Sequence, residues 1–176
     1  MKTWIPPERF LPYLTWKQVE ALPKERTLLV LPTAAIEQHG HHLPLATDTL
    51  INNFLLGHAL RRLPADLPVY ALAPVCYGKS NEHLGFPGTL AVSRDTFMAT
   101  LRDLGASVQA AGFRRLVFFN SHGGNHSLID VMARDLRAAG IDEVLTVLQE
   151  FPLNGESFER GQTLTVETFT PGEYVN

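Results

Sequence analysis

The chain has 176 residues, of which 15 are Lys or Arg and 18 are Asp or Glu, so its formal net charge is −3. Hydrophobic residues make up 45% and charged residues 19%, which is ordinary for a globular domain and excludes a mainly disordered chain. The slight acidic excess argues against nucleic acid or an anionic membrane surface as a partner, because either would require a basic patch. We therefore expect a single domain that buries roughly 70% of its unfolded surface.

The cysteine and the N-terminus together predict the cellular compartment. The single cysteine, Cys76, cannot form an internal disulfide, and the N-terminus carries no apolar run of the secretory type. No stretch approaches the roughly 20 apolar residues that a membrane-spanning helix needs. These features favour the reducing cytoplasm. Because Cys76 follows a predicted strand and no base is indicated beside it, we interpret it as a buried structural thiol rather than as a nucleophile.

Short apolar runs alternate with longer amphipathic stretches along residues 1–150. This pattern is typical of βαβ units around a mostly parallel sheet. The predicted strands cover residues 27–32, 69–75, 115–119 and 143–148. The predicted helices begin at Thr15 and then cover residues 49–63, 93–112 and 126–139. We therefore predict a doubly wound α/β domain formed by residues 1–150.

Capping residues support these helix boundaries. Ser93 precedes one predicted helix, and the glycines at 112 and 140 stand where two helices should end. Thr47 or Asp48 is predicted to cap the helix at 49–63.

Residues 151–176 differ from the rest of the chain. They are interrupted by Gly and Pro, and their only regular pattern is a predicted strand at 163–169. A stretch with so little periodicity is unusual inside a compact domain. We interpret it as an irregular tail of the same domain, an oligomerisation arm, or the remnant of something longer.

Polar clusters follow the first three predicted strands, at the point where each strand ends. In open α/β sheets, ligands bind at the carboxyl ends of the strands. We therefore expect the loops at 36–48, 77–89 and 120–125 to lie at one edge of the sheet, where their side chains can act together.

The first of these loops has the residue types of a metal site. Glu37 and His39 are two residues apart, so in extended backbone both side chains point to the same side. Asp48 can return to the same place because Gly40 and Pro44 allow the loop to fold back. Two carboxylates and an imidazole suit a divalent ion such as Zn²⁺, Mn²⁺ or Mg²⁺. An isolated pair of this kind is also common in solvated loops, and that interpretation stays open.

The third loop adds His122 directly after a strand. Gly123 and Gly124 leave room there for a ligand, or for backbone N–H donors at the start of a helix. Ser121 lacks the Gly-x-Ser-x-Gly setting of a nucleophilic serine.

The other histidines have simpler interpretations. His41 and His42 are expected to be exposed or to support the site from outside. His58 lies within a predicted amphipathic helix and is expected to be a surface or core residue.

Four segments carry a resemblance to a known family. Residues 31–48, LPTAAIEQHGHHLPLATD, resemble the first signature of the creatininase family of metal-dependent amidohydrolases, and residues 120–125, NSHGGN, resemble its second signature. Residues 77–89 are similar to the substrate-side loop between them, and residues 14–16 fit the opening segment. The four occur in family order, so the resemblance covers roughly residues 10–150.

The resemblance implies an α/β/α fold, a site for up to two Zn²⁺ or Mn²⁺ ions, and commonly a homohexamer. Family members open cyclic amides or hydrolyse formamides and related C–N bonds, and creatinine is one of several substrates. The positions that match metal ligands are Glu37, His39, Asp48 and His122, with Asp48 in the bridging place. The positions expected to contact substrate are Tyr77, Ser80, Glu82, His83, Gly123 and Gly124.

We therefore predict metal-assisted hydrolysis of a small amide, with His122, Glu37 and Asp48 as catalytic residues. Glu37, Asp48 and His122 are expected to hold one ion, and His39 with Asp48 a second. Two ions about 3.5–4 Å apart can hold a hydroxide that attacks the carbonyl carbon. Glu82 and His83 are the candidates for the acid that protonates the leaving nitrogen.

The sequence departs from the family after the fourth predicted strand. Members normally carry His-Ala-Gly followed by a Glu there, which supplies a catalytic His and, in many members, the last carboxylate ligand; this sequence does not contain the motif. Creatininase can instead place a Glu two residues after the His of the second signature, but Gly124 stands there. The candidates for a substitute are Glu150, Glu156, Glu159, Glu167 and Glu173.

Three hypotheses follow from this departure. The chain is an active hydrolase whose missing ligand comes from the tail or a neighbouring subunit. Alternatively, it is a shortened, weak or inactive member that acts as a metal-binding or structural protein. The third hypothesis is that it lacks segments of a longer protein.

Overall fold

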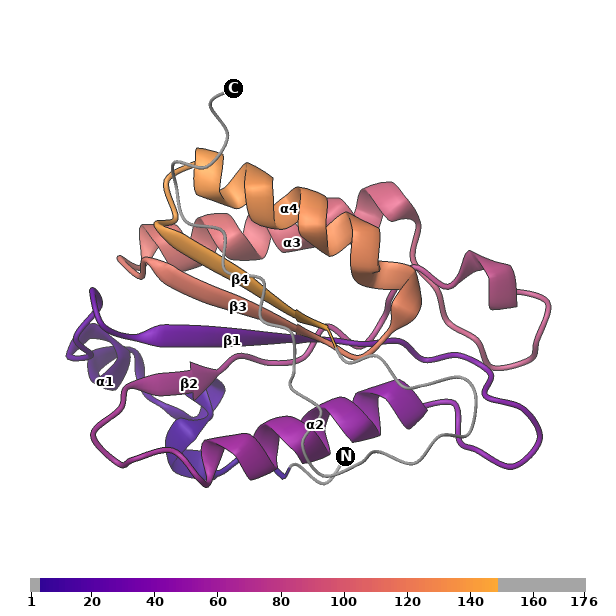
Figure 1. The fold of residues 1–176 in the computed structure, drawn as a ribbon, viewed down its shortest axis with the longest axis horizontal. Helices are drawn as coiled ribbons and strands as arrows, with labels where there is room; N and C mark the ends of the chain where they lie inside the picture. The colour runs from indigo at the N-terminus through magenta and orange to yellow at the C-terminus, as the bar shows by residue number, and fades with distance from the viewer. Residues whose placement is uncertain (1–3, 149–176) are drawn as a thin grey trace.

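Four parallel strands form the sheet of the computed structural model, in the order β2-β1-β3-β4 (Figure 1). The structure describes residues 4–148, so the predicted tail at 151–176, its strand at 163–169 and the five glutamates named above lie outside the described residues. The strands are β1 (Leu28–Thr33), β2 (Val69–Ala71), β3 (Arg115–Asn120) and β4 (Glu143–Leu148).

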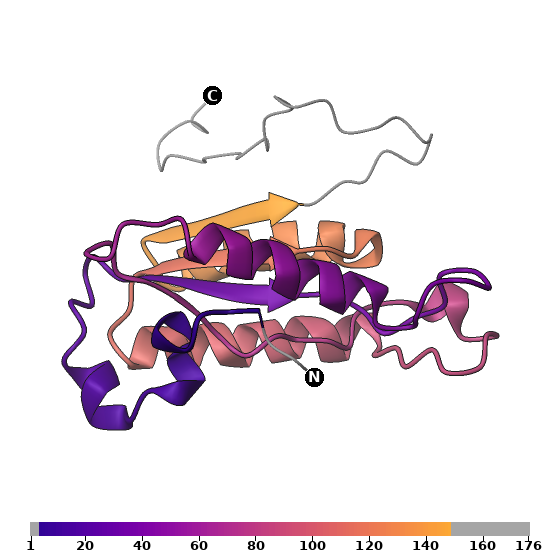
Figure 2. The ribbon, with the colours of Figure 1, turned by 90° about the horizontal axis from the view of Figure 1, so that it is seen from below.

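Helices cover both faces of this sheet. The α-helices are α1 (Trp16–Glu20), α2 (Thr47–Leu60), α3 (Arg94–Ala110) and α4 (His126–Ala138). Short 3₁₀ turns are η1 (Pro7–Arg9), η2 (Leu11–Tyr13), η3 (Asn81–His83) and η4 (Gly123–Asn125). Both views place α2 on one face and α3 with α4 on the other (Figure 1 and Figure 2). The predicted three-layer α/β/α fold is confirmed.

The sheet has one hydrophobic core on each face, and the side chains of a strand alternate between the two cores. Leu29 and Leu31 of β1 belong to the core beneath α3 and α4, together with Phe118 of β3. Val30, between the two leucines, belongs to the core beneath α2. Because side chains alternate between the faces of a strand, a strand covered on both sides must be apolar throughout. The uninterrupted run in β1 is therefore the sequence signature of a central strand.

Most predicted boundaries agree with the structure to within two residues. The Thr15 side chain accepts from the Gln18 N–H, and the Ser93 side chain accepts from the Thr96 N–H. Gly112 and Gly140 follow α3 and α4 with positive φ angles of 88° and 101°, the left-handed conformation that ends helices.

The predicted cap of α2 is wrong. Ala46 precedes the helix and makes no side-chain cap, while Thr47 and Asp48 both lie in its first turn. The Thr47 hydroxyl donates to the Pro44 carbonyl instead (2.6 Å), and the Asp48 carboxylate faces two histidines. The side chains predicted to cap the helix therefore have other partners.

Two further elements are shorter than predicted. Strand β2 ends at Ala71 rather than at residue 75, because Pro74 has no N–H to continue the ladder. A single bridge between Thr33 and Val75 resumes the pairing. Helix α2 ends at Leu60 rather than at residue 63, and its last N–H groups form tighter turns ahead of Pro64.

The strand order places a switch point between β1 and β3. Helix α2 carries the chain from β1 to β2 at one edge, and α3 then carries it back to the opposite side of β1. Ligands bind at such switch points, outside the carboxyl ends of the strands. Among residues 4–148, no helix is long and apolar enough to span a membrane.

The core beneath α3 and α4 predicts a strong effect of truncating one buried leucine. Leu101 of α3 is 0% exposed, so Leu101→Ala should lower the free energy of unfolding by about 2–5 kcal/mol through lost burial and a residual cavity. Urea unfolding followed by circular dichroism measures this change. Val131→Ala on α4, where the side chain is 45% exposed, is the control and should change stability by no more than about 0.5 kcal/mol. Equal effects of both variants would contradict the assignment of the core.

Candidate metal centre

Two carboxylates and two imidazoles meet at the switch point. Glu37 and His39 lie on the loop after β1, Asp48 lies in the first turn of α2, and His122 follows β3. Glu37, Asp48 and His122 are buried, and His39 is half-buried. These are the four residues predicted as ligands. The loop after β1 folds back on itself as expected, because the Glu37 N–H donates to the Leu45 carbonyl.

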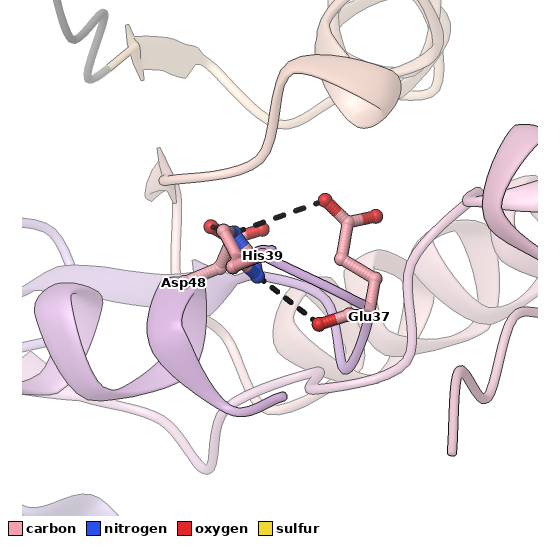
Figure 3. A group of neighbouring side chains, drawn as sticks. All are labelled: Glu37, His39 and Asp48. Carbon is pink, nitrogen blue, oxygen red and sulfur yellow. Dashed lines mark hydrogen bonds and ion pairs between the residues drawn. The ribbon is translucent and has the colours of Figure 1, made fainter. Parts of the chain in front are cut away.

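Asp48 stands between the two histidines. Its Oδ1 is 2.9 Å from His39 Nε2, and its Oδ2 is 3.0 Å from His122 Nδ1. Glu37 Oε1 lies 3.4 Å from His122 Nδ1 and 3.9 Å from His39 Nε2. Figure 3 shows Glu37, His39 and Asp48 pointing toward one another, and one potential ligand atom of each lies within 4.8 Å of the other two. Within residues 4–148, this is the only set of three or more His, Cys, Asp or Glu residues with such spacing.

Backbone carbonyls orient both imidazole rings. His39 Nδ1 is 3.0 Å from the Glu37 carbonyl oxygen, and His122 Nε2 is 3.0 Å from the Lys79 carbonyl oxygen. A carbonyl only accepts, so these two nitrogens carry the hydrogens and donate. The opposite nitrogens then face the carboxylates. Metal-binding histidines are typically held this way, with one nitrogen tied to a backbone carbonyl.

The buried carboxylates fit a cation. Glu37 Oε2 is buried and, among the described residues, has no hydrogen-bond partner, while the buried Asp48 Oδ2 has only the 3.0 Å contact with His122 Nδ1. Leaving buried carboxylate oxygens without partners is costly, and a bound divalent ion would remove that cost. Carboxylate and imidazole donors suit both Zn²⁺ and Mn²⁺. The residues present therefore fit a divalent metal.

The electrostatics of His122 indicate the same demand for positive charge. Burial lowers the pKa of its ring, but hydrogen bonds to Asp48 and Glu37 outweigh burial and raise that pKa to about 10. The carboxylates thus stabilise a cation at His122 Nδ1. A metal ion and this proton compete for the same nitrogen, so metal binding must release the proton.

The loop after β2 joins this edge of the sheet, as predicted. The Gln38 side chain donates from Nε2 to His83 Nδ1 (3.0 Å), and the Gln38 N–H donates to Thr89 Oγ1 (3.1 Å). These two bonds fasten the loop at 77–89 to the loop that carries Glu37 and His39.

The predicted substrate residues of the loop at 77–89 have different environments. Tyr77 is exposed, whereas Ser80 is buried and its Oγ has no hydrogen-bond partner within the described part of the chain. Glu82 is exposed and lies 3.1 Å from the Lys79 ammonium. A hydrogen bond from its own backbone and the contact with Lys79 lower the pKa of Glu82. Glu82 is therefore ionised near neutral pH.

The two glycines of the third loop differ sharply. A Cβ at Gly123 would meet nothing within 4 Å, so this position is open as predicted. A Cβ at Gly124 would collide with the Lys79 carbonyl oxygen and with His122 Nε2. Gly124 is thus required for the close approach of two loops.

The remaining predicted residues lie away from this contact network. His41 and His42 are exposed on the loop after β1, in agreement with their simpler interpretation. His58 is half-buried on α2, and its ring contacts that of Phe54 at a tilt of 56°, with the ring centroids 4.4 Å apart. Cys76 is half-buried, and burial raises the pKa of its thiol.

Sequence reasoning missed Lys79, Gln38 and Asn125. Lys79 acts through its backbone, which no side-chain pattern reveals. Gln38 stands between two predicted ligands, and Asn125 ends the second signature, so only their position in these motifs could have indicated them.

Comparison with known proteins identifies similar sequences. The model of the creatininase family, described as creatinine amidohydrolase, matches residues 12–170. A Mycobacterium tuberculosis protein named mycofactocin precursor peptide peptidase is 40% identical over 127 residues, which cover 69% of this chain and 50% of that protein. The Pseudomonas putida creatinine amidohydrolase is 33% identical over 152 residues, covering 81% and 57%. The chain thus spans about half the length of these curated relatives.

Solved structures of creatininase are also similar. The manganese form has a TM-score of 0.67 and 30% sequence identity, with 81% of this chain and 58% of that chain covered. A variant described as the Zn-Zn type has a TM-score of 0.64 and 30% identity, covering 85% and 58%. The similarity therefore includes metal-containing structures as well as sequence.

Asp48 is the residue whose loss should affect metal binding most, because both of its oxygens face a histidine. Asp48→Ala should abolish metal binding, as measured by elemental mass spectrometry on protein purified without chelator. Asp130→Ala removes an exposed carboxylate on α4, paired with Arg134 at 3.2 Å, and should leave the metal content unchanged. Full metal occupancy in Asp48→Ala would exclude this site.

Proposed function

The chain belongs to the creatininase family, and we propose that it is a metal-dependent hydrolase of a C–N bond in a small amide, cyclic amide or formamide. The observation that carries the proposal is the placement of Asp48 between two oriented imidazoles, with Glu37 beside them. Donors of this kind, buried at the carboxyl edge of a parallel sheet, can hold divalent ions next to a ligand.

We assign the ligands from these contacts. Glu37, Asp48 and His122 would hold one ion, and His39 with Asp48 a second. Bound Zn²⁺ or Mn²⁺ supplies Lewis acidity toward an amide carbonyl and activates water for attack. The negative charge of Asp48 would offset part of the positive charge concentrated there.

Proton transfer to the leaving nitrogen requires an acid on this chain. Between the two candidates, His83 is favoured over Glu82. Glu82 is ionised and paired with Lys79, so it has no proton to give. His83 Nδ1 accepts from Gln38, which leaves the hydrogen of the neutral ring on Nε2. We assign the imidazolium form of His83 as the proton donor: Nδ1 would take a proton in place of the Gln38 hydrogen bond, and the Nε2–H, too weak an acid in the neutral ring, would then pass to the leaving nitrogen.

Substrate binding would use the open side of the third loop. The position of Gly123 is open, so the backbone N–H groups of Gly123 and Gly124 are candidates to hold a substrate oxygen. The buried Ser80 hydroxyl, which has no partner among residues 4–148, is a second candidate donor, and exposed Tyr77 would border the entrance. The mycobacterial relative is named a peptide peptidase. A peptide C–N bond is therefore the other substrate class to test.

The family resemblance and the cysteine content bear on assembly and location. We propose a homo-oligomer, a hexamer by family resemblance, that acts in the cytoplasm. The lone cysteine supports the compartment.

A second candidate function is metal binding with little or no catalysis. The His-Ala-Gly…Glu motif of the family is not present in the sequence. The four proposed ligands lie outside that motif, whereas the family's catalytic His is part of it. A chain with these ligands alone would bind metal and act as a binding or structural protein.

The two candidate functions predict different results in a substrate screen. Protein loaded with Zn²⁺ or Mn²⁺ should generate a new primary or secondary amino group from at least one class among cyclic amides, formamides and short peptides, and chelation should abolish this reaction. Asp48→Ala should be inactive under the same conditions. A fully loaded protein that leaves all three classes intact would contradict the hydrolase and favour the binding protein.

His83 can be tested separately from the metal. His83→Ala should lower kcat by about 100-fold or more, the usual contribution of a general acid, while the metal content stays the same. The pH profile of kcat should lose the limb that reports the acid. His58→Ala, on the outer part of α2, is the control and should keep wild-type kcat. An unchanged kcat in His83→Ala would exclude His83 as the proton donor.

A further inference from the structure

Asn125 is a fully buried asparagine at the end of η4 that connects all three loops of the site. Its side chain is 0% exposed. Oδ1 accepts from the Lys79 N–H (3.0 Å), and Nδ2 donates to the Ala34 carbonyl (3.1 Å) and to Asn120 Oδ1 (3.3 Å). Ala34 follows β1, Lys79 lies in the loop after β2, and Asn120 ends β3. One amide group therefore ties together the segment after β1, the loop after β2 and the end of β3.

The two backbone partners of Asn125 fix the orientation of its amide. The Lys79 N–H only donates and the Ala34 carbonyl only accepts, so the oxygen and nitrogen of the amide cannot be exchanged. Gly78 shows how closely the loop approaches this residue, because a Cβ there would lie 2.7 Å from Asn125 Oδ1 and 2.6 Å from the Ala34 oxygen.

Asn125 reaches His122 through Lys79. The Lys79 N–H is held by Asn125, and the carbonyl of the same residue accepts from His122 Nε2 at 3.0 Å. When the ring is neutral, as metal binding requires, that carbonyl keeps the single hydrogen of His122 on Nε2. With the hydrogen on Nε2, the lone pair of Nδ1 is directed at the Asp48 and Glu37 carboxylates, which lie 3.0 and 3.4 Å away.

The backbone of His122 is held by the same network. Asn120 Nδ2 donates to the His122 carbonyl (2.7 Å), and Asn120 Oδ1 accepts from the Thr33 hydroxyl (3.1 Å). Asn120 Oδ1 also accepts from Asn125 Nδ2. Asn125 thus joins the group that holds the backbone of His122 to the group that holds its ring.

We propose that Asn125 is a positioning residue that, through the Lys79 carbonyl, directs His122 Nδ1 to the metal. The Asn125 side chain hydrogen-bonds neither Glu37 nor Asp48; it holds the Lys79 peptide that accepts the His122 Nε2–H, and it bonds Asn120, which holds the His122 backbone. The proposal rests on the metal centre described above but not on hydrolysis. A partner that fixes a ligand's tautomer in this way typically changes metal affinity by about 10- to 100-fold.

Zinc affinity and histidine nuclear magnetic resonance test the proposal in the full chain. Asn125→Ala should weaken Zn²⁺ binding by about 10- to 100-fold in competition with a chromophoric chelator. In protein labelled with nitrogen-15 histidine and saturated with Zn²⁺, the His122 Nε2–H resonance should shift or disappear. The His39 Nδ1–H resonance should stay in place, because its acceptor is the Glu37 carbonyl. Asn53→Ala is the matched control: Asn53 is buried and donates to the Thr49 carbonyl, and its loss should move neither readout.

An unchanged His122 resonance in Asn125→Ala would overturn the proposal, whatever happens to affinity. An equal loss of affinity in Asn53→Ala would also overturn it, because any buried asparagine would then have the same effect. Wild-type protein that binds Zn²⁺ but hydrolyses nothing would contradict the proposed function and leave this test intact.

A pair of glycine variants tests the same link if Asn125→Ala does not fold. Gly124→Ala places a methyl group against the Lys79 carbonyl and His122 Nε2, whereas Gly123→Ala places one in open space. We expect Gly124→Ala to weaken Zn²⁺ binding and alter the His122 Nε2–H resonance, and Gly123→Ala to retain wild-type values. Equal behaviour of the two glycine variants would refute the link between Lys79 and His122.

Discussion

Two carboxylates buried side by side impose the central constraint on this structure. Glu37 and Asp48 are only 6% and 7% exposed. Both carboxylates face His122 at the carboxyl edge of the sheet. Like charges at this depth are tolerated only with compensating positive charge. The site therefore requires a cation, either a proton on His122 or a metal ion. The loops around it are arranged to present nitrogen lone pairs to that cation.

The start of α2 is organised around the same requirement. Asp48 lies in the first turn, where the positive end of the helix dipole favours a carboxylate. Its side chain is free to reach His39 and His122 because it does not cap the helix. The Ser121 hydroxyl donates to the Asp48 carbonyl at 2.9 Å and so joins the end of β3 to this turn. The helix loses a side-chain cap, and the site gains a carboxylate that is fixed at both its backbone and its side chain.

The fold was largely predictable because its signals are local. The apolar run of β1, the cap at Ser93 and the glycine at 112 each determine an element without reference to distant residues. Ligands bind at the carboxyl ends of parallel strands, and this rule predicts that Glu37, His39 and His122 lie at one edge of the sheet. The end of β2 and the start of α2 were less predictable, since each depends on a partner that only the tertiary structure supplies. The contacts of Lys79 and Asn125 were not predictable at all. Every residue has a backbone carbonyl, so the sequence does not mark that of Lys79 as special, and its partner His122 lies 43 positions away.

The division of the site between local and distant residues bears on what this chain can do. All four proposed ligands, and the carbonyls that orient their rings, lie within residues 4–148. The family motif that supplies a catalytic His has no counterpart in the sequence, and the chain spans about half the length of its curated relatives. The proposed metal binding depends on the convergence of the loop after β1, the first turn of α2 and the loop after β3, all of which lie within residues 4–148. The proposed proton transfer depends on His83, which lies outside that convergence and whose loop is fastened to the ligand loop by Gln38. The proposed metal binding and the proposed proton transfer therefore rest on different residues, and a substitution at His83 should remove the second without the first.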